Sequence, residues 1–156
     1  MKAKFNVLSL IIFIAIPLVV GGISSLLTRQ AMVSFASLNK PMLSPPAWLF
    51  PVAWSVLYVL MGIASYTMFY SNHDLASIAL IVYALQLIMN FFWSIIFFNT
   101  ERYWMALIWL LIMWGLIILL VLLTARFSIV GMICLIPLLA WTTFAAYLNF
   151  MIARMN

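Results

Sequence analysis

Five apolar stretches, each of more than about 20 residues, limit what this chain can fold into more than any other feature of its sequence. They cover about residues 7–27, 46–70, 75–98, 103–124 and 128–153. An α-helix of that length crosses the hydrocarbon core of a bilayer, where only helices and closed barrels satisfy their backbone hydrogen bonds. We therefore predict an all-α integral membrane protein, with residues 1–156 forming one domain, a five-transmembrane-helix bundle.

The composition supports this interpretation. Hydrophobic residues make up 69% of the chain and charged residues only 6%, whereas a soluble domain carries roughly a quarter charged residues. The first apolar stretch is longer than the apolar core of a secretory signal peptide, so it is expected to be a transmembrane helix. Every connection except residues 28–44 is short, which favours antiparallel packing of successive helices.

The charged residues argue against several classes of function. The net charge of +5 is spread over seven Lys and Arg without a cluster, whereas nucleic-acid binding needs a basic patch. An excess of positive charge fits anionic lipid headgroups at the ends of the spans. His73 is the only histidine, and Asp74 and Glu101 are the only acids. We therefore expect no metal site, no catalytic residues and no resident cofactor.

Five spans place the two termini on opposite faces of the membrane. The basic residues of the two faces are Lys2, Lys4 and Arg126 on one, and Arg29, Lys40, Arg102 and Arg154 on the other. This division is too even for the positive-inside rule to orient the protein.

The longest polar connection, residues 28–44, has two interpretations. Ala31, Met32, Phe35 and Leu38 recur at helical spacing, which is typical of a short amphipathic helix lying on the membrane surface or over the mouth of the bundle. The same residues also fit an ordinary ordered loop. The sequence leaves both interpretations open.

Prolines mark the entry to the second apolar stretch. Pro45 and Pro46 lack a backbone N–H and cannot lie deep inside a helix, so we predict that Ser44 is the N-cap and that the prolines occupy the first helical positions. Pro51 would then lie one turn further in, where it should bend the helix or leave a carbonyl without a partner.

Aromatic and amide side chains on the second and third stretches form the candidate site. Trp54 and Tyr58 are four residues apart and share one helical face; they fit either the wall of a ligand site or an interfacial aromatic belt. Gln86 and Asn90 also share a face and should point into the bundle. There they could bond a neighbouring helix or contact a ligand.

Three patterns in order along the chain are more specific. The first comprises Leu38, Asn39, Lys40, Pro41, Pro45, Pro46, Trp48, Phe50, Pro51, Trp54, Leu57, Tyr58, Met61 and Gly62. The second comprises Gln86, Leu87, Asn90, Trp93, Phe97 and Phe98, and the third Pro137, Leu139, Trp141, Phe144, Ala145, Leu148 and Asn149. Together they resemble the translocator protein family, also called tryptophan-rich sensory protein or peripheral benzodiazepine receptor, over essentially the whole chain.

The resemblance implies a five-helix bundle, often a homodimer, with a pocket that opens towards the first loop. Members of that family bind porphyrins such as protoporphyrin IX, and some bind sterols and benzodiazepine-type drugs. The positions that match the family's pocket are Trp54, Asn90, Trp141 and Ala145, with Trp48 and Tyr58 in the same pattern. The chain departs from the family pattern at Leu43, Ser34, Phe35, Leu138 and Phe150, the last standing where a sterol-recognition pattern expects tyrosine.

The resemblance therefore leads us to expect a multi-pass protein of a bacterial cell membrane that binds tetrapyrroles and has a sensory or regulatory role in porphyrin handling. Its expected partners are a porphyrin or other flat hydrophobic ligand, membrane lipids and a second copy of the chain. Two alternatives stay open: an enzyme that degrades porphyrin in light, and a transporter of porphyrin or sterol.

Overall fold

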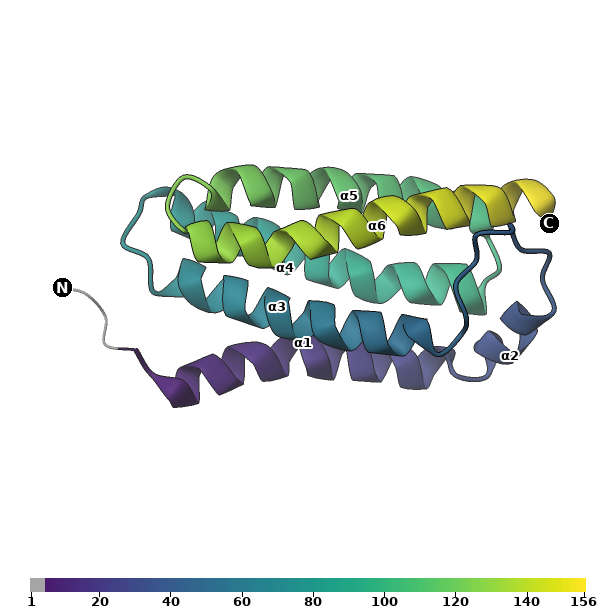
Figure 1. Cartoon of the computed structure of the whole chain (residues 1–156), viewed down its shortest axis with the longest axis horizontal. Coiled ribbons are helices and arrows are strands. Elements are labelled where there is room, and N and C mark those ends of the chain that lie inside the picture. The colour runs from purple at the N-terminus through teal and green to yellow at the C-terminus, as the bar shows by residue number, and fades with distance from the viewer. Residues whose placement is uncertain (1–4) are drawn as a thin grey trace.

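The computed structural model describes residues 5–156, and Lys2 and Lys4 lie outside that range. Five long helices run along one axis (Figure 1). They are α1 (Val7–Thr28), α3 (Leu49–Phe69), α4 (Leu75–Ser94), α5 (Tyr103–Thr124) and α6 (Ile129–Met155). All are long and apolar enough to cross a membrane. The predicted all-α bundle of five transmembrane helices is thus confirmed.

Two short elements lie at one end of the bundle. The helix α2 (Ala31–Ala36) forms within the first connection, and the π-helical turn η1 (Ile95–Asn99) continues α4. Both lie at the end that carries the C-terminus, opposite the end where α1 begins (Figure 1). A short helix in the first connection is one of the two structures that the sequence left open.

Close packing between α1 and α3 depends on glycine at two positions. A Cβ added to Gly62 would lie 2.4 Å from Cα of Ile14, so only glycine lets α3 approach the backbone of α1 this closely. A Cβ on Gly21 would lie 2.1 Å from the ring of Tyr58. Gly22, the next residue, has nothing within 4 Å of its Cβ position.

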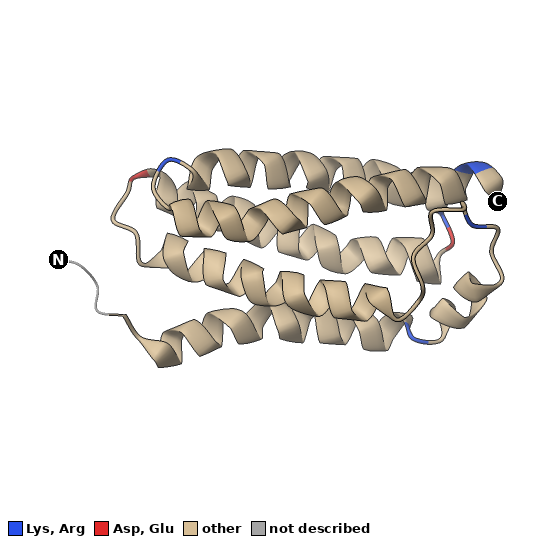
Figure 2. Cartoon of the chain, viewed as in Figure 1, with Lys and Arg blue, Asp and Glu red and all other residues tan. Residues whose placement is uncertain are grey.

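The surface of the bundle is apolar along its length and charged at its ends. Among the residues that the structure describes, Lys, Arg, Asp and Glu gather at the two ends of the bundle (Figure 2). Large apolar side chains such as Ile11, Val19 and Leu122 are exposed between them, whereas Gln86 and Asn149 are buried. Apolar side chains outside and amides inside are the distribution that a lipid solvent favours.

The start of α3 differs from the prediction. The helix begins at Leu49, not at Pro46, and Ser44 is not its N-cap; Trp48 holds that position without a side-chain hydrogen bond. The backbone N–H of Leu49 donates to the carbonyl of Pro46 at 3.0 Å, which closes a turn before the helix starts. Pro51 is therefore in the first helical turn, where no N–H is needed, and not one turn further in as predicted.

Candidate functional site

A cavity of about 350 Å³ lies at the end of the bundle that carries α2. Its walls come from α1, α2, α3, the last turn of α4 with η1, and α6. Seven aromatic side chains dominate its lining: Phe35, Phe50, Trp54, Tyr58, Trp93, Phe97 and Phe98. Its volume lies within the range of about 300–1,000 Å³ that is usual for small-molecule sites.

The α3 wall presents two stacked rings. Trp54 and Tyr58 lie on one face of the helix, with ring centroids 5.5 Å apart and planes 29° apart. The hydroxyl of Tyr58 donates to Oδ1 of Asn90 on α4 at 2.9 Å. This bond fixes the ring, and Asn90 itself lies behind Tyr58, outside the lining.

Buried amides on α4 form a polar layer behind this wall. Gln86 is fully buried, and neither atom of its amide has a hydrogen-bond partner among residues 5–156. The Nδ2 of Asn90 and the hydroxyl of Tyr83 lack one in the same part of the chain. The prediction that Gln86 and Asn90 point into the bundle agrees with their burial.

Asn149 on α6 stabilises the opposite wall. The sequence analysis named it only as part of the third family pattern and not as a site residue. Asn149 accepts from Nε1 of Trp93 at 3.2 Å and donates through Nδ2 to the carbonyl of Tyr103 at 2.9 Å. One amide therefore ties α4, α5 and α6 together beside the cavity. Asn149 is 1% exposed; its bond with Trp93 is buried and its bond with Tyr103 is partly buried.

The turn η1 sets the direction of two lining rings. The N–H of Thr100 bonds the carbonyl of Ile95, five residues back, at 3.3 Å. This wider turn shifts the helix register at Phe97 and Phe98. The periodicity of the sequence assumes a regular α-helix, so it did not predict this π-helical turn.

The helix α2 covers the cavity. Phe35 reaches from it to the rings of Phe50, Phe97 and Phe98, at centroid distances of 6.5, 5.9 and 5.5 Å. Lys40 also lines the cavity, with its Nζ 4.7 Å from the Phe35 ring centroid. The segment that covers the cavity thus contributes one aromatic ring, Phe35, and one cation, Lys40, to the lining.

The segment after α2 is fastened to the C-terminal residue. The backbone N–H of Asn39 donates to Oδ1 of Asn156 at 3.1 Å, and Nδ2 of Asn156 donates to the carbonyl of Asn39 at 3.0 Å. This pair of bonds, called the Asn39–Asn156 clasp below, joins the cover of the cavity to α6.

The residues predicted from sequence fall into two groups. Trp54, Tyr58 and Ala145 line the cavity. Asn90 lies behind Tyr58, and Trp141 lies behind Phe50 with its ring centroid 6.0 Å away. Trp48 is 64% exposed and does not line the cavity. A role in ligand binding stays a prediction for all six.

Comparison with known proteins places the chain in a family. Residues 13–155 match the model of the TspO/MBR family. The chain is 33% identical to the Tryptophan-rich protein TspO of Chlorobaculum tepidum over 97% of its own length and 98% of that protein. It is 34% identical to the Tryptophan-rich sensory protein of Cereibacter sphaeroides, covering 78% of this chain and 76% of the relative.

A mammalian relative matches less of the chain. The Translocator protein of Bos taurus is 34% identical over 74% of this chain and 70% of its own length. The bacterial relative from Chlorobaculum tepidum matches 97% of the chain, in agreement with the expected location in a bacterial cell membrane. The five spans, the family match and these identities together show that the chain is a multi-pass membrane protein that belongs to the TspO/MBR family.

Proposed function

We propose that the protein binds a planar tetrapyrrole, such as protoporphyrin IX, in the cavity beneath α2, and that this binding serves a sensory or regulatory role in porphyrin handling. The observation that supports it most is the aromatic lining, in which Trp54 and Tyr58 offer adjacent ring faces. Aromatic rings attract a flat π-system in offset or edge-on arrangements.

Polar groups at the cavity fit the edges of such a ligand. Lys40 brings a positive charge to the lining, which suits the carboxylate of a porphyrin propionate through a charge-assisted hydrogen bond. Ser24, Ser25 and Thr28 line the α1 side. The apolar rings would therefore hold the macrocycle while the cation and hydroxyls meet its polar substituents.

A fluorescence titration tests the proposal. Protoporphyrin IX should quench the tryptophan fluorescence of the purified full chain. Replacing Trp54 with Leu should raise Kd about tenfold, because an aromatic contact contributes about 0.5–1.5 kcal/mol beyond the area it buries. Trp54→Phe keeps a ring and should recover part of that loss.

The matched control is Trp104→Phe. Trp104 is on α5, is 55% exposed and does not line the cavity, so its replacement should leave Kd unchanged. Equal affinity for wild type and Trp54→Leu would refute the proposed site. Equal losses in Trp54→Leu and Trp104→Phe would refute it as well, because Trp104 does not line the cavity.

A further inference from the structure

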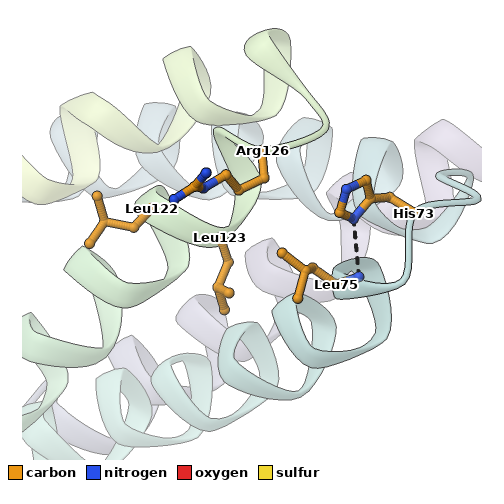
Figure 3. Close-up of a pocket in the computed structure, with 5 residues that line it drawn as sticks. All are labelled: His73, Leu75, Leu122, Leu123 and Arg126. Carbon is orange, nitrogen blue, oxygen red and sulfur yellow. Dashed lines mark hydrogen bonds between the residues drawn. The ribbon is translucent and has the colours of Figure 1, made fainter.

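A second cavity lies at the other end of the bundle, far from α2. It has a volume of about 520 Å³ and is lined by His73, Leu75, Leu122, Leu123 and Arg126. These residues come from the turn before α4, the start of α4 and the end of α5 with the following turn. Figure 3 shows His73 and Leu75 on one side of the cavity and Leu122 on the other, with Leu123 between them and the Arg126 side chain extending from its turn towards Leu122.

The orientation of His73 is fixed. Its Nδ1 accepts from the backbone N–H of Leu75 at 3.1 Å, so the proton of the neutral ring is on Nε2. The ring also stacks on Phe127, with centroids 5.3 Å apart and planes 26° apart. Neither contact uses Nε2–H, which is therefore available as a hydrogen-bond donor.

Arg126 supplies the second donor. It is exposed in the turn after α5, and its backbone N–H bonds the carbonyl of Leu123 at 3.1 Å, which anchors the turn. Within residues 5–156 its guanidinium makes no hydrogen bond to the protein. A cation and an N–H donor therefore border one cavity, neither of them with a partner among residues 5–156.

The surroundings specify what could fill the cavity. It lies at an end of the bundle where charged residues gather (Figure 2), and the ends of membrane-spanning helices lie at the level of the lipid headgroups. Leu122 is 60% exposed, and Ile78 and Ile81 on α4 and Leu119 on α5 are exposed further along the bundle. Hydrogen-bond donors at the end of the bundle, next to exposed aliphatic side chains, suit an amphiphile with a phosphate headgroup and acyl chains.

We propose that this cavity binds the phosphodiester headgroup of an anionic phospholipid. One phosphate oxygen accepts from Nε2–H of His73, and the guanidinium of Arg126 donates to the others, a pairing suited to the planar fork of arginine. The acyl chains lie along Leu122 and the exposed aliphatic side chains of α4 and α5. Asp74 is next to His73 but does not line the cavity, and its charge opposes the lipid.

The test is native mass spectrometry of the full chain in detergent, titrated with phosphatidylglycerol. Arg126→Gln should weaken binding of the first lipid about tenfold. Arg154→Gln is the matched control, because it removes the same charge at the opposite end of the bundle and should have no effect. Asp74→Asn should tighten binding. Equal losses in Arg126→Gln and Arg154→Gln would overturn the proposal, since they would reflect the net charge alone.

Further arms separate the lipid from a free anion. Phosphatidylcholine should bind more weakly than phosphatidylglycerol, and inorganic phosphate in large excess should not displace the lipid. Displacement by phosphate would overturn the assignment to a lipid. His73→Phe keeps the ring on Phe127 and removes Nε2–H, so it should weaken binding as well. This variant tests the site even if Arg126→Gln fails to fold, and unchanged binding in it would contradict the proposed pairing.

Discussion

Two adjacent glycines of α1 should respond in opposite ways to the same substitution. Gly21 and Gly22 look equivalent in sequence, but only Gly21 faces the ring of Tyr58, whose nearest atom would lie 2.1 Å from an added Cβ. Nothing lies within 4 Å of the same position on Gly22. Gly21→Ala must therefore displace the ring, whereas Gly22→Ala adds a methyl group to open space.

The magnitudes follow from the contacts involved. Gly22→Ala should stabilise the protein by up to about 1 kcal/mol, the difference in helix propensity between the two residues. Gly21→Ala gains the same term but loses about 1–3 kcal/mol to overpacking. It also loses about 0.6 kcal/mol if the bond from Tyr58 to Asn90 breaks. The helix-propensity term cancels between the two variants, so their stabilities should differ by about 1–4 kcal/mol.

Unfolding of the two variants in detergent, followed by tryptophan fluorescence, measures this difference. Trp54 stacks on Tyr58, so the spectrum of folded Gly21→Ala should also shift, whereas that of Gly22→Ala should match wild type. Because Tyr58 lines the cavity, Gly21→Ala should weaken porphyrin binding as well. Equal stability and equal spectra for the two variants would refute the contact between Gly21 and Tyr58.

Three further predictions test other parts of the structure by the same unfolding and binding measurements. Gly62→Ala should destabilise the protein by at least about 1–3 kcal/mol, because its Cβ would meet the backbone of Ile14; Gly115→Ala, with nothing within 4 Å, is its control and should not. Gln86→Leu should stabilise by about 1 kcal/mol, since it removes a fully buried amide without partners in the described chain; a loss of stability would mean that the amide is satisfied. Asn156→Ala should open the Asn39–Asn156 clasp and speed both association and release of protoporphyrin in stopped-flow traces; unchanged rates would show that the segment does not control entry.

The sequence was enough to predict the five long helices, because each apolar stretch is long enough to cross the membrane as an α-helix. It also placed Trp54 and Tyr58 on one face, since residues four apart in a helix always lie together. Gln86 and Asn90 were assigned to the interior by the cost of exposing amides to lipid. These inferences depend on the spacing of residues along the chain and on its apolar composition, which indicates a lipid surrounding. Both can be read from a single sequence.

Other features depend on contacts between distant residues. Asn149 bonds Trp93, which is 56 positions away, and no spacing rule pairs them. The register shift at η1 and the different surroundings of Gly21 and Gly22 follow from packing between helices. The start of α3 was misplaced because a turn closed by Pro46 competes with a helix that begins at the same proline.

The measurement that tests the central claim most directly is a structure of the protein with protoporphyrin IX bound. We expect the macrocycle in the cavity beneath α2, in van der Waals contact with Trp54 and Tyr58, with a propionate near Lys40. A porphyrin bound on the lipid-facing surface, with that cavity closed, would contradict the account.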